Sequence, residues 1–123
     1  MNTILLSVKP EYSEKIFNGV KKFEYRKSLA KKDVNRILIY TTSPIKLIIG
    51  EVEVIEKISL EVTKLWAKTQ NYSGISKKKY LWYFNGNTNA SAYKLGKITK
   101  YETPKTLDQF GVKQAPQSFV YIK

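Results

Sequence analysis

Three charged side chains in one short stretch, Lys21, Glu24 and Arg26, have the types and spacing best suited to chemistry in this sequence. Residues 22–26 alternate polar and aromatic side chains, which predicts a strand with Glu24 and Arg26 on one face. A guanidinium offers a planar fork to a phosphate or a base edge, and a carboxylate accepts from exocyclic amines. The pair therefore either converges on a ligand or forms an ordinary surface ion pair. Lys21 has the opposite parity and joins them only if the turn at Gly19 rotates it.

The residue types that are missing restrict the chemistry further. The chain has no cysteine and no histidine, so disulfides, thiolate zinc sites, cysteine nucleophiles and imidazole bases are all excluded. Any catalysis must use Lys, Glu, Tyr, Ser, Thr or backbone amides. Glu51, Glu53 and Glu56 have no aspartate cluster near them in the sequence, so we expect no metal site and no cofactor.

Basic side chains are concentrated at the two ends of the 123-residue chain, which has a formal net charge of +12. Residues 1–36 hold nine basic and four acidic side chains, residues 37–76 hold four of each, and residues 77–123 hold nine and two. This distribution indicates a surface that contacts a polyanion such as nucleic acid. Lysine-rich turns that only maintain solubility are the alternative interpretation.

Domain organisation and location follow from length and hydropathy. No linker, repeat or low-complexity tract divides the sequence, so we expect one domain over residues 1–123. The first residues lack a basic segment followed by a long apolar one, and the longest unbroken apolar run is residues 80–84. We therefore expect a cytoplasmic protein with no membrane partner. Nothing in the sequence specifies the oligomeric state.

Periodicity and turn signals predict an α+β, mainly β fold. Strands are expected at residues 3–8, 22–26, 36–40, 46–58, 90–101 and 117–122. Helices are expected from Pro10 to Gly19, from 60 to 70 after a cap at Ser59, and from a cap at Ser76 to Gly86, with a helical turn at 107–110. Gly50 indicates a bulge or a close backbone approach. Strands that are not regularly separated by helices favour a small, mostly antiparallel, closed or nearly closed barrel of about six strands.

Residues 77–84 interleave lysines with aromatic side chains, as proteins that bind single-stranded nucleic acid do. On a helix, however, Tyr80, Leu81 and Phe84 fall on one side, which predicts that they pack in the core. Trp82 and Tyr83 are then the candidates for exposure.

The pattern Gly-x-Lys-x-x-Glu-x-Arg at residues 19–26, after Ser-Val-Lys-Pro-Glu-Tyr at 7–12, resembles the opening of an ASCH domain, a member of the PUA-like superfamily. Three later stretches support the resemblance: residues 39–44 with 49–53, residues 83–86 with 92–93, and residues 116–119. Together the matches extend from Thr3 to Ile122.

The resemblance implies a PUA-like pseudo-barrel with short helices in its connections and a cleft between the barrel and the first helix. ASCH domains are generally thought to bind RNA or nucleotides in that cleft. The matched positions are Lys9, Lys21, Glu24 and Arg26, with Tyr40, Thr41 and Ser43 from the opposite strand end and Gln117 and Ser118 from the last strand.

Some proteins that resemble this family are enzymes, so a metal-free hydrolase is the alternative, with Lys21 and Glu24 as its catalytic residues. Lys21 and Arg26 match a lysine and an arginine of small acetylcytidine amidohydrolases, but Glu24 stands where those enzymes carry a threonine nucleophile. Other members are ribonucleases that use Lys, Tyr and Ser. Such a set could come from Lys9, Lys21, Tyr40, Ser43 and Ser118. A protein-interaction module is a third reading, which no residue favours.

Overall fold

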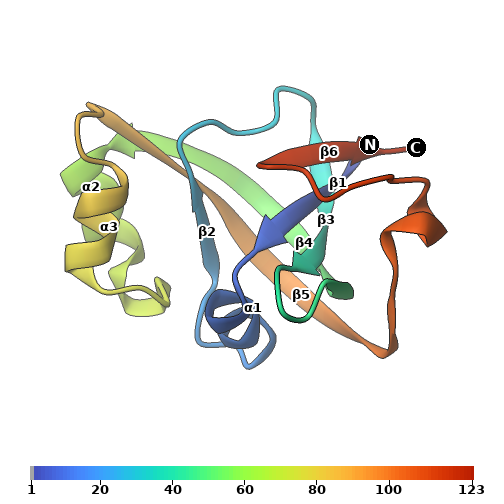
Figure 1. The fold of residues 1–123 in the computed structure, drawn as a ribbon. Helices are drawn as coiled ribbons and strands as arrows, with labels where there is room; N and C mark the ends of the chain where they lie inside the picture. Colours follow the sequence, from blue (N-terminus) through green and yellow to red (C-terminus); the bar gives the residue numbers. More distant parts are fainter. Residues whose placement is uncertain (1) are drawn as a thin grey trace.

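Six strands form one curved sheet in the order β2-β5-β4-β3-β1-β6 (Figure 1). The computed structural model describes residues 2–123. The strands are β1 (Asn2–Val8), β2 (Phe23–Arg26), β3 (Val34–Thr41), β4 (Leu47–Glu61), β5 (Asn89–Lys105) and β6 (Phe119–Ile122). The helices are α1 (Pro10–Phe17), α2 (Val62–Thr69) and α3 (Lys77–Tyr83), with short 3-10 helices η1 (Gln70–Tyr72) and η2 (Leu107–Phe110). The predicted α+β class with six strands and short helices is confirmed.

Neighbouring strands run antiparallel except β1 and β3, which are parallel. The two long strands β4 and β5 pair along most of their length, and their register shifts three times. Each such bulge bends the strands and increases their twist, so the sheet curls. Among residues 2–123 no backbone pairing joins the edge strands β2 and β6, and the sheet therefore keeps two edges.

Three apolar clusters fill the fold. The first lies between α1 and the strands β1, β3 and the middle of β4 and β5, around Ile4, Ile16 and Tyr93. The second lies where α2 and α3 cover β2 and the outer ends of β4 and β5, around Leu65 and Tyr80. The third lies on the other face of β1 and β3, under η2. In Figure 1, α2 and α3 accordingly stand apart from α1, and β4 and β5 run from one group to the other.

Several predicted boundaries are confirmed and others are wrong. The Ser76 hydroxyl accepts from the Lys79 backbone N–H and caps α3, as predicted. Ser59 does not cap α2, because β4 continues to Glu61 and the Ser59 hydroxyl pairs with that of Ser91 on β5. Leu81 is 40% exposed rather than buried. Helix α3 has only seven residues, and only Tyr80 and Phe84, one turn later, point into the core.

Gly50 lies where two other segments approach the backbone of β4. The β3–β4 and β4–β5 registers both shift beside it. A side chain there would collide with the backbone of Thr99 and Lys100 and with the Phe17 ring. The predicted bulge and close approach are both present, and they let α1 pack tightly on the sheet.

Within residues 2–123 no helix has the length and apolarity needed to cross a membrane.

A pair of glycine substitutions tests this packing. Gly50→Ala is expected to lower the free energy of unfolding by about 1–3 kcal/mol, because the added methyl group meets backbone that cannot move aside. Gly96→Ala is the matched control, since its methyl group meets mainly the exposed Ile55 side chain, which can change rotamer. Urea titration of both variants measures the difference, and equal losses would contradict the close approach at Gly50.

Candidate functional site

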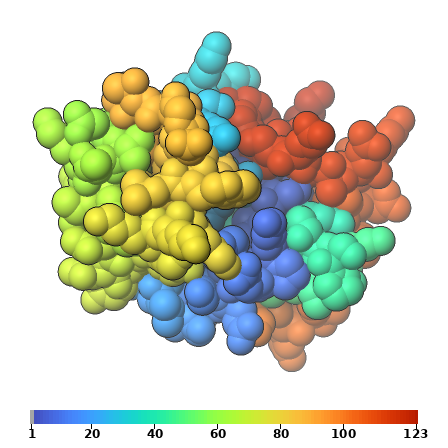
Figure 2. Space-filling view, turned by 60° about the vertical axis from the view of Figure 1, so that its left-hand side comes forward, coloured from blue at the N-terminus to red at the C-terminus, as the bar shows by residue number. Residues whose placement is uncertain are grey.

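A cleft of about 370 Å³ opens between the two larger apolar clusters. Its walls come from the end of β1 and the start of α1 on one side, and from β2, α3 and the loop before α3 on the other. Figure 2 shows these segments on one face of the molecule, with α3 in yellow beside α1 in blue. Of the nine predicted site residues, five line this cleft: Lys9, Lys21, Glu24, Arg26 and Gln117.

The Arg26 guanidinium spans the gap between edge strand β2 and strand β1. Its Nη2 donates to the backbone oxygen of Ser7 at 2.7 Å, and its Nε donates to Glu24 Oε2 at 3.0 Å. Both side chains of this ion pair are largely buried, at 14% and 9% exposure. The Ser7 hydroxyl in turn donates to the Pro116 carbonyl at 2.7 Å, which ties the segment before β6 to the same place. Glu24 and Arg26 share one strand face, as their spacing predicts, and form a buried pair rather than a surface one.

Lys21 also points into the cleft, although its parity is opposite to that of Glu24. The reason is that β2 begins only at Phe23, so Lys21 belongs to the turn that follows Gly19, which has a φ of 84°. The Lys21 side chain is 3% exposed, and its Nζ donates to the Ser73 carbonyl at 2.7 Å. Its ammonium lies 4.8 Å from the centre of the Tyr25 ring.

Burial lowers the pKa of Lys21 from its ordinary 10.5 to about 8, because water no longer solvates the ammonium. The nearby Glu24 carboxylate acts in the opposite direction and raises the pKa. The positive charges of Lys15 and Arg26 lower it again. At neutral pH the cleft therefore holds an ammonium group that gives up its proton more readily than an ordinary lysine does.

The loop before α3 has a composition that accommodates this lysine. Gly74 has a φ of 66°, and a side chain at this position would overlap the methylene groups of Lys21. The Gly74 carbonyl accepts from Lys15 Nζ of α1 at 3.2 Å. Two lysines thus bind two successive carbonyls of one loop, and no larger residue than glycine fits between them.

Aromatic rings form much of the remaining cleft wall. Tyr25 is held by a 2.6 Å hydrogen bond between its hydroxyl and that of Thr69, and burial raises its pKa to about 12. Burial, together with the charges of Glu11 and Glu24, raises the pKa of Tyr12 as well. These phenols therefore stay neutral at physiological pH and offer hydroxyls and ring faces rather than charge.

Four predicted site residues lie outside the cleft lining. Tyr40 is buried in the cluster on the other face of the sheet, and the Thr41 hydroxyl pairs with that of Ser13 at 2.7 Å. Ser43 is exposed on the turn after β3, and Ser118 is exposed just before β6. The backbone oxygen of Ser118 accepts from the Ser7 N–H, so only its main chain approaches the site.

Sequence reasoning missed seven residues that line the cleft: Ser7, Val8, Tyr12, Tyr25, Thr42, Ile75 and Tyr83. The position of Thr42 depends on the parallel pairing of β1 with β3, which continues as a hydrogen bond from the Thr42 N–H to the Val8 carbonyl. No local pattern encodes such a register between distant strands. Tyr12 and Tyr83 carried a detectable signal, because both are aromatic residues on helices that also carry lysines.

Residues 2–123 contain no group of three or more Asp or Glu side chains placed to hold a metal ion. In the cleft itself, the lining includes one carboxylate, that of Glu24, and it is engaged by Arg26. The lining therefore has the donor set of an anion or nucleotide site rather than that of a cation site.

Comparison with known proteins adds an independent line of evidence. A family model described as the ASCH domain matches residues 6–108. An ASCH domain-containing ribonuclease of Zymomonas mobilis is 29% identical over 124 residues, which cover 97% of this chain and 83% of that protein. A protein named ATP synthase subunit alpha from Ureaplasma parvum is 34% identical over 122 residues. That match covers 98% of this chain but only 15% of the relative, so the chain spans a small part of that longer protein.

The structural comparison agrees over nearly the whole length. The crystal structure of ASCH from Zymomonas mobilis superposes with a TM-score of 0.90 at 28% sequence identity. The match covers 98% of this chain and 87% of that chain.

The buried lysine makes a prediction about stability and pH. Between about pH 8 and 10.5 the folded protein has released the Lys21 proton while the unfolded chain still holds it, so stability rises with pH in this window. Relative to Lys21→Met, the wild type should gain about 2 kcal/mol of unfolding free energy from about pH 7 to 9.5. Urea titrations of both proteins at several pH values measure this difference. Parallel pH profiles would show that Lys21 is not buried as an ammonium.

Proposed function

This chain belongs to the ASCH domain family, and from that premise we propose that it binds RNA, or a nucleotide-sized part of it, in the cleft. The observation that carries the proposal is the convergence of Lys9, Lys21 and Arg26 on one hollow whose single carboxylate, Glu24, is already paired. A hollow with an uncompensated positive charge attracts a phosphate. Its tyrosine walls suit a base.

The cleft residues divide into two roles under this proposal. Lys9 is exposed at the start of α1 and its side chain is free to approach a phosphate, while Lys21 provides a second cation deeper in the cleft. Tyr12 and Tyr83 offer ring faces for a base, and Gln117 offers an amide for its edge. Arg26 is committed to Ser7 and Glu24, so it shapes the cleft more than it meets a ligand.

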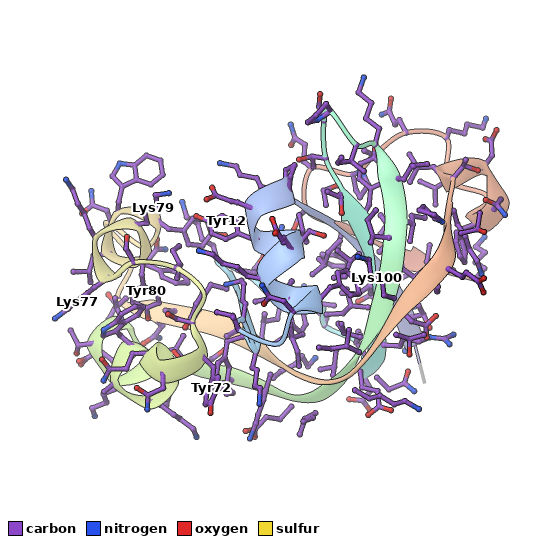
Figure 3. All side chains as sticks on the ribbon, turned by 90° about the horizontal axis from the view of Figure 1, so that it is seen from below. Tyr12, Tyr72, Lys77, Lys79, Tyr80 and Lys100 are labelled. Carbon is purple, nitrogen blue, oxygen red and sulfur yellow. The ribbon has the colours of Figure 1, made fainter. Side chains whose placement is uncertain are left out.

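Binding can be tested with a labelled single-stranded RNA and fluorescence anisotropy at several salt concentrations. Lys9→Ala should weaken binding several-fold and reduce the slope of log K against log salt by about 0.7, the contribution of one phosphate contact on a single strand. Lys100→Ala is the matched control, because Lys100 is an exposed lysine outside this cleft, on the other side of α1 from Tyr12 in Figure 3. Equal effects of the two substitutions would mean that the cleft is not the binding site.

RNA cleavage at the same cleft is a second candidate function, and the pKa of Lys21 near 8 is the observation that favours it. A relative that covers most of this chain carries the name ribonuclease. In its neutral form Lys21 could take the proton of a ribose 2′-hydroxyl. The 2′-oxygen would then attack the adjacent phosphorus and the bond to the 5′-oxygen would break. The products are a 2′,3′-cyclic phosphate and a 5′-hydroxyl, whose proton comes from water.

Cleavage is separated from binding by Lys21→Arg. Arginine keeps the positive charge but its pKa is too high to release a proton, so this variant should bind RNA and fail to cleave it. The wild type should cleave in the presence of a chelator, with a rate that rises as the pH approaches 8. Gel analysis of end-labelled RNA measures both. Cleavage that persists at the wild-type rate in Lys21→Arg would remove Lys21 as the base.

A further inference from the structure

Helix α3 presents an aromatic and basic surface to solvent next to the cleft. Trp82 is 79% exposed, the highest value among the exposed large apolar side chains of residues 2–123. On the opposite side of the same helix, Tyr80 and Phe84 are buried in the second apolar cluster, so the helix is anchored and the position of Trp82 is set by it. An indole ring in water loses the hydrophobic free energy that burial would give, and the exposed Trp82 ring is not needed to pack the core.

The order of side chains around α3 leads from the cleft to Trp82. Residues three and four apart on a helix are neighbours, so Tyr83, Lys79, Trp82 and Lys78 follow one another around its circumference. Tyr83 lines the cleft, with the ammonium of Lys27 at 5.2 Å from its ring centre. Aromatic and cationic side chains therefore alternate from the cleft outward.

Lys79 connects α3 to α1 next to the cleft. Its Nζ is 4.0 Å from Glu11 Oε1 on α1, at the limit of an ion pair between two exposed side chains. Figure 3 shows Lys79 on the side of α3 that faces Tyr12, whereas Lys77 points away from α1. A strand that leaves the cleft over this edge of α3 meets Lys79 first and Trp82 next.

We infer that the RNA strand held in the cleft continues across α3, with a base stacked on Trp82 and its phosphates beside Lys78 and Lys79. This inference rests on the proposed function and makes it narrower. The ligand is single-stranded RNA of several nucleotides rather than a free nucleotide or a duplex. Stacking on an exposed ring accepts any base, so this surface adds affinity and length preference rather than base specificity.

The geometry favours a single strand because only unpaired bases have a free face. In an RNA duplex each base is stacked between its neighbours. The indole of Trp82, which lies outside the duplex, therefore finds no free base face to stack on. The lysines at Lys78 and Lys79 would attract either form, so Trp82 is the residue that distinguishes them.

The test uses the 123-residue chain and two RNA probes, a dinucleotide and a single strand of about 12 nucleotides, a length within the usual site sizes of single-strand binders. Trp82→Ala should weaken binding of the longer strand by roughly five- to a hundredfold and leave the dinucleotide affinity unchanged. Trp82→Phe should restore much of the loss, because phenylalanine still offers a ring. Leu81→Ala is the matched control, since Leu81 is an exposed apolar neighbour that lies off the path.

The outcomes separate this inference from the proposed function. If wild type and Trp82→Ala bind the long strand equally while both bind the dinucleotide, the cleft proposal stands and the path over α3 is wrong. If Trp82→Ala weakens binding of an RNA duplex of the same length as much as it weakens binding of the single strand, stacking is not the cause and the inference fails. If neither probe binds the wild type even at low salt, both proposals fail. Quenching of Trp82 fluorescence by the long strand alone would support the path directly.

Discussion

The guanidinium of Arg26 connects strands β2 and β1, which no backbone hydrogen bonds join within residues 2–123. Strand β2 is an edge strand, paired on one side with β5 only, and its other side faces β1 without a ladder of hydrogen bonds. Arg26 replaces that ladder with one charge-assisted bond to the Ser7 carbonyl, and Glu24 holds the guanidinium in the plane needed to reach it. The distance between β2 and β1, and with it the shape of the cleft, depends on this bridge.

A buried ammonium next to this bridge is the second constraint. The Lys21 ammonium loses most of its contact with water. One carbonyl and two tyrosine rings replace part of the lost solvation energy. Hydrogen bonding to Ser73 uses one of its three donors, so an incoming anion finds a cation that is already desolvated and held in place. Such pre-organisation makes an electrostatic contact stronger than the same contact between mobile surface groups. The arrangement that destabilises the empty fold is thus the one that would favour a ligand.

Local patterns predicted what local physics determines. The alternation of β2 placed Glu24 and Arg26 on one face, and Ser76 marked the start of α3 because its hydroxyl caps the first turn. The orientation of Lys21 depends on Gly74, more than fifty residues later, which no pattern around Lys21 could reveal. The resemblance places Tyr40 in the cleft, yet residues 37–41 of β3 are buried on both faces of the sheet and Tyr40 points into the cluster on the face away from the cleft. The family and the element order were therefore readable from sequence, whereas the cleft lining depended on strand register and on a distant loop.

The walls of the cleft belong to two different apolar clusters. One wall includes α1 and the turn after it, and the other includes α3 and the loop before it. The side-chain hydrogen bonds and ion pair between these two walls are polar contacts. They are the bonds of Lys15 and Lys21 to the loop carbonyls and the loose pair of Lys79 with Glu11. The Lys79–Glu11 pair is exposed and is therefore screened by salt, whereas the Lys21 bond to Ser73 is buried and is screened much less. Salt in the surrounding medium is therefore expected to act first on the outer contact between Lys79 and Glu11, and least on the buried part of the cleft where Lys21 is held.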